Sequence, residues 1–260
     1  MATDAPEPPE PAAHAIERLA AIMRRLRDPK TGCEWDTVQT FETIAPYTIE
    51  EAYEVADAIA RKDMDALADE LGDLQLQVVF HSQMAAEAGH FTLAEVIDGI
   101  CDKMERRHPH IFGDAEHGGH HLWEEIKAAE RKKSPDPSAL AGVALALPAL
   151  ERAAKLQRRA ARVGFDWPDT AGPRAKIDEE LAELDAESDH QRMLEELGDL
   201  LFAVVNLSRH LNIEPEAALR EANQKFEKRF RAMEELAGGS FSQLDLEAQE
   251  KLWEQVKRAP

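Results

Sequence analysis

Two stretches decide how this chain folds: DELGDLQLQVVFHSQ at residues 69–83 and EELGDLLFAVVNLSR at residues 195–209. In both stretches the apolar residues recur at spacings of three and four, which is typical of a helix that buries one face. Both also carry Glu-Leu-Gly-Asp at the same place, so the second stretch is a copy of the first. The sequence therefore predicts a duplicated helical unit.

The duplication extends well beyond these two helices. Further segments pair in the same order in both halves: AIERLAAIMRRL (15–26) with ALERAAKLQRRA (149–160), TIEEAYEV (48–55) with KIDEELAEL (176–184), and DKMERRH (102–108) with QKFEKRF (224–230). We therefore expect an all-α fold of tandem duplicated helical-bundle modules. Its expected parts are a disordered acidic, proline-rich tail over 1–13, a first helical domain over 14–133, a linker over 134–146 and a second helical domain over 147–260.

Capping signals predict where two of the helices begin. Thr92-Leu-Ala-Glu95 and Ser188-Asp-His-Gln191 both match the capping box, in which the first side chain accepts a hydrogen bond from the backbone three residues later. We therefore expect one helix to start at Thr92 and another at Ser188.

Composition and charge exclude several classes of partner. The 260 residues carry 31 Lys+Arg against 51 Asp+Glu, a net charge of −20. Such a surface repels phosphate backbones and anionic lipids, so we expect no nucleic acid polymer and no membrane as a partner. The N-terminal residues have neither a basic nor an apolar region, so we expect no signal peptide, and the longest apolar stretch, 139–147, is shorter than the roughly 20 residues of a membrane span. With two cysteines and no CxxC pair, a cytoplasmic protein with reduced thiols is expected.

Carboxylates recur at helical spacing at the same two points of each half. One helix carries Glu-Glu-x-x-Glu and the next carries Glu-x-x-Asp, and each spacing places its members on one helix face. Like charges packed together destabilise a fold, and Mg²⁺ or Mn²⁺ with oxygen ligands relieves the repulsion. The expected metal ligands are Glu51, Glu54, Glu70 and Asp73 in the first half, and Glu180, Glu183, Glu196 and Asp199 in the second.

The alternative is that these acids form solvated helix faces, as most acidic runs do. Two details favour a site. Leu71 and Leu74 flank the aspartate of the first copy, and Leu197 and Leu200 flank that of the second, which predicts a buried stripe beside the carboxylates. Gly72 and Gly198 each cost about 1 kcal/mol relative to Ala in the middle of a helix, so we expect another helix or a ligand to approach closely there.

This ordered set of motifs resembles the MazG-type nucleoside triphosphate pyrophosphohydrolases. The resemblance rests on EExxE followed by ExxD in both halves, RRHPHIFGD (106–114), LGDLLFAVVNLSRHL (197–211), ANQKFEKRF (222–230) and KLWEQVK (251–257). It implies Mg²⁺-dependent hydrolysis of ordinary or aberrant nucleoside triphosphates to monophosphate and pyrophosphate, as removal of unwanted nucleotides or control of the nucleotide pool. It also implies a homodimer, with Glu180, Glu183, Glu196 and Asp199 as the catalytic metal-binding set.

A triphosphate also needs cationic partners. Lys225 and Arg229 stand four residues apart, and Lys103 and Arg107 repeat that spacing in the first half. The spacing alone explains them equally well as salt-bridge partners of neighbouring glutamates, whereas the resemblance favours phosphate binding. The nucleotide-binding candidates are Lys176, Arg192, Lys225, Lys228, Arg229 and Trp253.

Two aromatic features of the sequence admit more than one interpretation. Trp253 and its counterpart Trp123 could stack on a base or belong to the core. The histidine-rich segment has irregular spacing and no neighbouring cysteine, which disfavours zinc; its members are His108, His110, His117, His120 and His121.

The sequence leaves three questions of function open. Both halves keep a full acidic set, so activity in the first, the second or both is possible, although the resemblance favours the second. A narrow-substrate pyrophosphohydrolase acting on dUTP or phosphoribosyl-ATP is the nearest alternative. A non-catalytic helical scaffold that senses nucleotides is the other.

Overall fold

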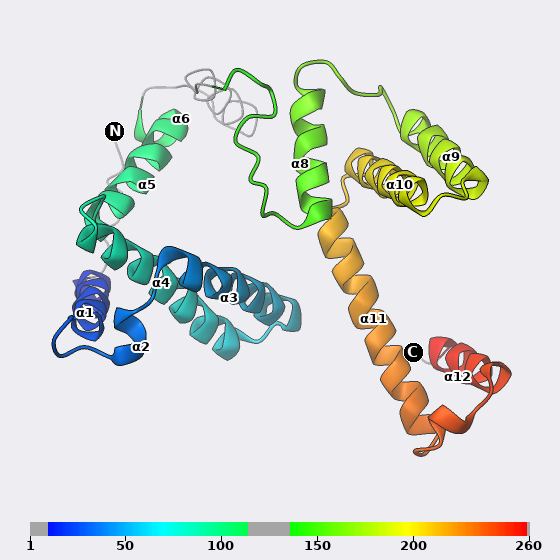
Figure 1. The fold of residues 1–260 in the computed structure, drawn as a ribbon, viewed down its shortest axis with the longest axis horizontal. Helices are drawn as coiled ribbons and strands as arrows, with labels where there is room; N and C mark the ends of the chain where they lie inside the picture. Colours follow the sequence, from blue (N-terminus) through cyan, green and yellow to red (C-terminus); the bar gives the residue numbers. More distant parts are fainter. Residues whose placement is uncertain (1–9, 114–135, 259–260) are drawn as a thin grey trace. The chain divides into compact units, whose positions relative to one another are not determined.

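The computed structural model describes residues 10–113 and 136–258, and within these ranges it contains helices and turns with no β-strand. The chain divides into two compact units, Met1–Ala128 and Ala129–Pro260 (Figure 1). The expectation of an all-α fold is confirmed. In the described ranges no helix is both long enough and apolar enough to cross a membrane.

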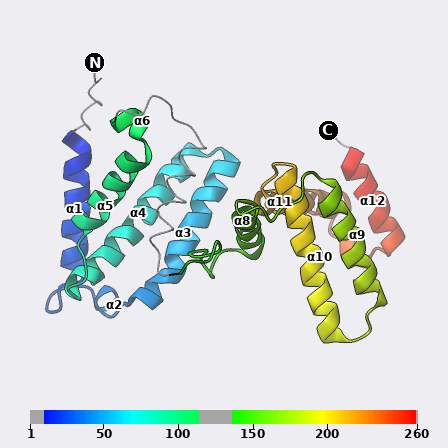
Figure 2. The ribbon, with the colours of Figure 1, turned by 90° about the horizontal axis from the view of Figure 1, so that it is seen from above.

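The first unit is built around an antiparallel helix pair. Lys62 adopts a left-handed conformation (φ 58°), and the Asp63 side chain accepts a hydrogen bond from Ala66 N, so α3 ends and α4 begins within a tight turn. The two helices lie side by side, and α1 packs on α4 (Figures 1 and 2). The helices of this unit are α1 (Glu10–Leu26), α2 (Glu34–Thr37), α3 (Phe41–Arg61), α4 (Met64–Glu87), α5 (Leu93–Arg107) and α6 (Pro109–Phe112).

The second unit repeats the antiparallel pair. Here α9 and α10 lie side by side, α8 packs on α10 as α1 packs on α4, and α11 packs on α12 (Figure 2). Its elements are α8 (Ala149–Ala161), α9 (Ala171–Ala186), α10 (His190–His210), α11 (Pro215–Leu236), the 3₁₀ turn η1 (Phe241–Gln243) and α12 (Leu246–Arg258).

The core of the first unit lies where α1, α3 and α4 meet. Its buried cluster consists of Met23, Ile44, Val79, Phe80 and Met84. The predicted burial beside the carboxylates is wrong for Leu71 and Leu197, which are 49% and 44% exposed, whereas Leu74 and Leu200 are half-buried. The burying stripe of α4 runs through Val79 and Phe80 instead, on another face of the helix.

Of the two predicted caps, one is confirmed. Thr92 and Glu95 form a reciprocal capping box at the start of α5. Ser188 does not cap α10, because Asp189 is the residue before its first turn and accepts hydrogen bonds from the backbone N–H groups of Gln191 and Arg192. A carboxylate one residue later satisfies these donors more directly than the serine would.

The expected tail and linker differ from the observed elements. Helix α1 starts at Glu10, so residues 10–13 of the expected tail are helical, and residues 1–9 lie outside the described ranges. The described part of the expected linker packs on the second unit. Ala141 and Val143 are buried there, and the Arg159 guanidinium donates to the carbonyl oxygens of Ala139 and Ala141.

Candidate functional site

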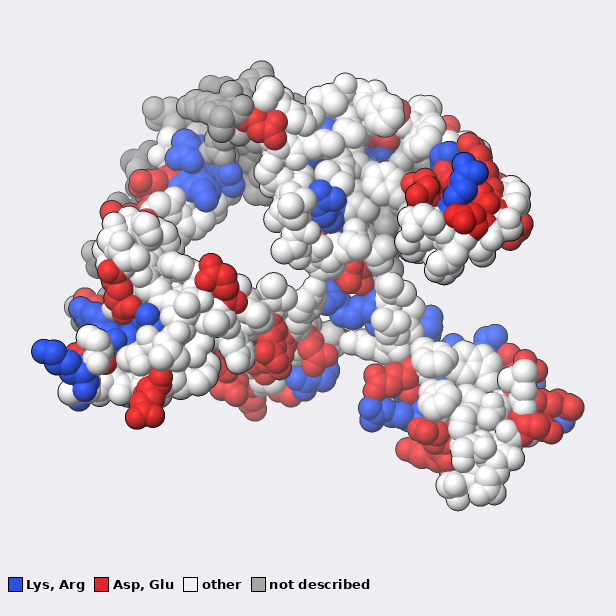
Figure 3. Space-filling view, viewed as in Figure 1, with Lys and Arg blue, Asp and Glu red and all other residues white. Residues whose placement is uncertain are grey.

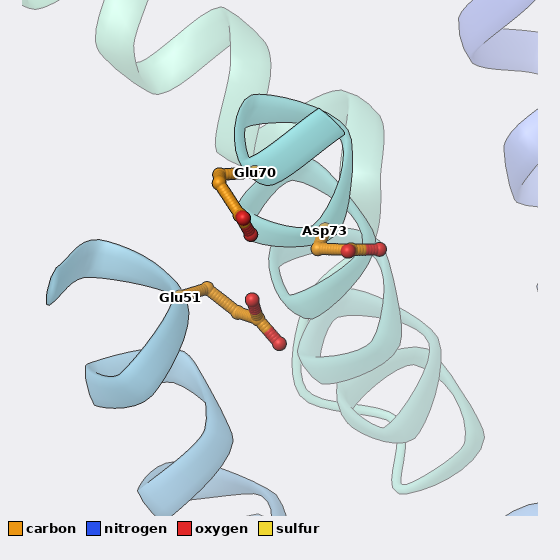
Figure 4. Close-up of side chains that lie close together, drawn as sticks. All are labelled: Glu51, Glu70 and Asp73. Atoms are coloured by element: carbon orange, nitrogen blue, oxygen red, sulfur yellow. The ribbon is translucent and has the colours of Figure 1, made fainter. Parts of the chain in front are cut away.

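The first acidic cluster lies between α3 and α4. Glu51 extends from α3 toward α4, where Glu70 and Asp73 lie one turn apart (Figure 4). One carboxylate oxygen from each residue lies within 4.8 Å of the others. Burial and the neighbouring Asp73 and Glu54 carboxylates raise the pKa of Glu51, and burial and Glu54 raise the pKa of Glu70. The structure thus brings three of the four predicted residues into one group, with Glu54 close enough to act on two of them.

The second acidic cluster occupies the same place between α9 and α10. Glu180, Glu183 and Glu196 each offer one oxygen within 4.8 Å of the others, and Glu180 is 3% exposed. Burial raises the pKa of Glu196, and so do Glu183, Glu180 and Asp199 in turn. Around this pair of helices, Figure 3 shows acidic side chains surrounding a smaller group of basic ones.

The second cluster differs from the first in having a lysine beside it. Lys176 Nζ lies 2.5 Å from Glu180 Oε1 and 3.0 Å from Glu179 Oε1, and these hydrogen bonds raise the pKa of the lysine. By the repeat, Tyr47 holds the equivalent position in the first unit. Buried Glu180 therefore has a cationic partner, and Glu51 has an aromatic residue one turn away instead.

Three convergent carboxylates suit a hard divalent cation. Mg²⁺ and Mn²⁺ prefer oxygen ligands, and their charge offsets the burial and the carboxylate repulsion that together raise the pKa values of Glu51, Glu70 and Glu196. The donor sets of both clusters fit such an ion.

A cleft of about 660 Å³ adjoins the second cluster. Lys176, Glu180 and Asp199 are among the residues that line it, so Asp199 shares this space with Glu180 of the cluster although its oxygens are not within the 4.8 Å group. The rest of the wall comes from α8, α10, the segment between α8 and α9, and the chain before α8. These residues are Leu140, Leu156, Gln157, Ala160, Gly164, Phe165, Asp166, Trp167, Phe202, Ala203, Asn206 and Arg209.

An ion pair holds the segment that carries Trp167. The Arg209 guanidinium donates to both carboxylate oxygens of Asp166, with Nη1 2.9 Å from Oδ2, and His210 Nε2 lies 3.1 Å from Oδ1. The pair with Arg209 holds the pKa of Asp166 below its usual range. The segment 164–167 is thereby fixed to α10.

Gly172 lets Trp167 lie against the start of α9. A β-carbon at Gly172 would lie 2.1 Å from Trp167 Cδ1, so no larger residue fits without moving the ring. By contrast, β-carbons at Gly72 and Gly198 would meet no described atom within 4 Å. The predicted close approach at those two glycines is therefore not made by the described chain.

The remaining predicted nucleotide-binding residues lie elsewhere in the second unit. Arg192, in the first turn of α10, has Nη1 3.5 Å from Glu187 Oε2. Its charge partly offsets the rise in the pKa of Glu196. The other four lie on α11 and α12, and none of them lines the cleft; they are Lys225, Lys228, Arg229 and Trp253. The centroid of the Trp253 ring lies 5.7 Å from that of Phe226, and the Arg229 guanidinium lies over the Trp253 ring. Trp123 and His117, His120 and His121 fall outside the described ranges.

Sequence reasoning missed most of the cleft. Trp167 belongs to no motif of the sequence, and Gln157, Phe202 and Asn206 lie on helix faces to which the sequence assigns no role. The available signal was the comparison of the halves, because Gln157 and Asn206 stand where the first half has Met23 and Phe80.

Comparison with known proteins identifies the family. The model of the MazG nucleotide pyrophosphohydrolase domain matches residues 39–112 and 177–233, the parts that carry the two acidic clusters. The chain belongs to the MazG family. The nucleoside triphosphate pyrophosphohydrolase of Escherichia coli K12 is 52% identical over 256 residues, which cover 94% of this chain and 97% of that protein.

Two other relatives match most of this chain. The nucleoside triphosphate pyrophosphohydrolase/pyrophosphatase MazG of Thermotoga maritima is 48% identical over 245 residues, 93% of this chain and 95% of that protein. The uncharacterized protein YabN of Bacillus subtilis is 44% identical over 255 residues, 94% of this chain but 52% of its own length.

Proposed function

We propose that this chain hydrolyses nucleoside triphosphates to nucleoside monophosphate and pyrophosphate. The relatives from Escherichia coli and Thermotoga maritima carry this activity in their names, and both match nearly the full chain. The observation that carries the proposal is the cleft itself. Lys176, Glu180 and Asp199 line the same cleft as Trp167 and Phe202, so a cation suited to phosphates and carboxylates suited to a metal ion share the cleft with aromatic groups suited to a nucleoside.

Magnesium is part of this proposal, with manganese as a substitute. The ligands would be Glu180, Glu183, Glu196 and Asp199, and both burial and the neighbouring carboxylates raise the pKa of Glu196, which a bound cation would offset. A bound Mg²⁺ supplies charge neutralisation at the phosphates and a lower pKa for a coordinated water.

The chain's own residues would divide the remaining work. Lys176 supplies a positive charge at the phosphate end of the cleft, and it already holds buried Glu180 in place. A glutamate of the cluster that the metal leaves unbound is suited to accept the proton that the attacking water loses. Asp166 and Arg209 orient the segment that presents Trp167.

We place the hydrolysis in the second repeat. The first repeat has an acidic cluster as well, but it has Tyr47 in place of Lys176. Its equivalents of Gln157 and Asn206 are Met23 and Phe80, which are buried in the core. The first cluster is therefore suited to bind metal, with less room and less positive charge for a nucleotide.

The proposed assembly is a homodimer. Large apolar residues stay exposed at equivalent places on α4 and α10: Leu71 and Leu197 are about half exposed, and Val78 and Val204 are 37% and 44% exposed. Helical modules of this size complete their bundles by pairing, and a second copy would cover these faces. Sedimentation analysis tests this, with a monomer at micromolar concentration as the contrary result.

Product analysis tests the reaction. The protein is incubated with Mg²⁺ and each of a panel of triphosphates, and the products are separated by anion-exchange chromatography. We expect monophosphate and pyrophosphate in equal amounts, whereas diphosphate and orthophosphate would overturn the proposal. A preference above about 10³-fold for dUTP or phosphoribosyl-ATP would identify the narrow-substrate alternative. Binding without pyrophosphate release would identify the nucleotide-sensing scaffold.

A further inference from the structure

The two repeats differ where the first helix of each unit packs on the antiparallel pair, α1 on α4 in the first unit and α8 on α10 in the second. In the first unit Met23 on α1 and Phe80 on α4 are 1% and 3% exposed and belong to the apolar core. At the equivalent positions of the second unit, Gln157 on α8 and Asn206 on α10 are 6% and 8% exposed, and both line the cleft. Burial of two uncharged polar side chains costs stability unless they find partners.

Hydrogen bonds fix which atom each of these amides offers. Gln157 Nε2 donates to the carbonyl oxygen of Phe202 at 2.8 Å, which sets Oε1 as the remaining atom. Oε1 is buried and has no hydrogen-bond partner among the described residues. Asn206 Oδ1 accepts from Arg209 Nη2 at 2.7 Å, so its NH₂ group is left to donate. Of these two cleft-lining side chains, Gln157 therefore keeps one unpaired acceptor and Asn206 keeps its donor.

Aromatic surface lies beside this pair. Trp167 and Phe202 are 41% and 42% exposed although both line the cleft, and the Asp166–Arg209 ion pair fixes the segment of Trp167. Exposed rings of this kind stack on a heterocycle of any identity. An acceptor, a donor and flat apolar surface together match a nucleobase edge and face.

We propose that Gln157 and Asn206 read the nucleobase of the substrate: Gln157 Oε1 accepts from a base N–H, and the Asn206 NH₂ donates to a ring nitrogen or carbonyl oxygen. This inference rests on the proposed function and adds its specificity-determining residues. Adenine and cytosine both present an amino group beside a ring nitrogen. The pair thus recognises a base by its donor and acceptor without demanding one particular ring, and the first repeat, with Met23 and Phe80, has no such pair.

The test combines a substrate change with a side-chain change. Wild type and Gln157→Met, which introduces the residue of the first repeat, are assayed for pyrophosphate release with two substrate pairs. These are ATP with purine riboside triphosphate, and CTP with zebularine triphosphate, whose second members lack only the amino group. We expect wild type to prefer the amino-bearing member about 5- to 100-fold in kcat/KM, and the preference to fall within about threefold in the variant.

Two further variants make the result specific. Gln77 on α4 also has a buried Oε1 without a described partner, but it lies in the first unit, so Gln77→Met leaves the amino preference unchanged. Asn206→Ala lowers kcat/KM for both members of a pair alike, because both keep the ring nitrogen that it binds.

Each contrary outcome is distinct. Equal use of both members of both pairs by the wild-type enzyme overturns the inference even if Gln157→Met does not fold. A preference that survives in Gln157→Met also overturns it. In both cases hydrolysis persists and the proposed function stands. Absence of pyrophosphate from every triphosphate overturns the proposed function and this inference with it.

Discussion

Lys176 Nζ lies 2.5 Å from Glu180 Oε1, at the point where the second acidic cluster opens into the cleft. The carboxylate is nearly buried, so the lysine supplies the positive charge that a metal ion would otherwise provide. The first cluster lacks this feature because Tyr47 stands at the equivalent position.

Removal of this lysine should destabilise the second unit most in the absence of a divalent cation. Lys176→Met leaves Glu180 without its charged partner, and we expect the free energy of unfolding at pH 7 to fall by about 1–3 kcal/mol. Saturating Mg²⁺ should restore part of the loss. Urea denaturation with Mg²⁺ and with EDTA measures both effects.

A matched control is Lys251→Met, because Lys251 pairs with Glu247 at 2.8 Å with both side chains more than 70% exposed. Such a pair contributes less than about 0.5 kcal/mol. If the two variants lose equal stability, Lys176 has no special part in holding Glu180.

The contact of Gly172 with Trp167 predicts a defect in substrate binding. Gly172→Ala forces the ring away from the start of α9, and we expect KM to rise about 10-fold through lost stacking, together with a shift in tryptophan emission. Gly72→Ala serves as the control: its β-carbon meets no described atom, so it should raise the free energy of unfolding by about 1 kcal/mol and leave KM unchanged. An unchanged KM in Gly172→Ala would remove Trp167 from the binding site.

His81 predicts a pH dependence of stability in the first unit. Its ring stacks on Phe41 with Nε2 3.0 Å from Thr48 Oγ1, and burial lowers its pKa. Because the folded state disfavours the charged ring, the unfolded chain binds a proton first as the pH falls through about 6.5, and stability falls with it. The unfolding free energy should therefore drop between pH 7.5 and 5.5.

The variant His81→Leu places there the residue that the second repeat carries at Leu207. Its unfolding free energy should change less over the same pH range than that of the wild type, as measured by urea denaturation at each pH. Parallel pH profiles for the two proteins would show that His81 does not titrate on unfolding.

The sequence predicted those parts of the site that lie on one helix or on two helices joined by a short connection. Spacings of three and four placed Glu180 and Glu183 on one face, and the short connection to the next helix brought Glu196 to them. The cleft could not be found that way, because the Gln157 contact with Phe202 joins residues 45 positions apart on two helices that cross. Trp167 likewise takes its place from the Asp166–Arg209 ion pair, which joins residues 43 positions apart.

Two predictions from the sequence were wrong, and neighbouring residues explain why. Ser188 matched the capping pattern, but the neighbouring Asp189 carboxylate reaches the same backbone donors. Leu71 and Leu197 follow the acidic motif in sequence, yet the helix turns them away from the core. Periodicity fixes the angle between residues and leaves open which face a neighbouring helix will cover.

The most direct test of the central claim compares one carboxylate in each cluster. Glu183→Gln and Glu54→Gln remove the same charge at equivalent positions of the second and first repeats, and pyrophosphate release from ATP is followed under saturating Mg²⁺. The account predicts a loss of about 100-fold or more in Glu183→Gln and less than about threefold in Glu54→Gln. Intact turnover in Glu183→Gln, with loss in Glu54→Gln, would contradict it.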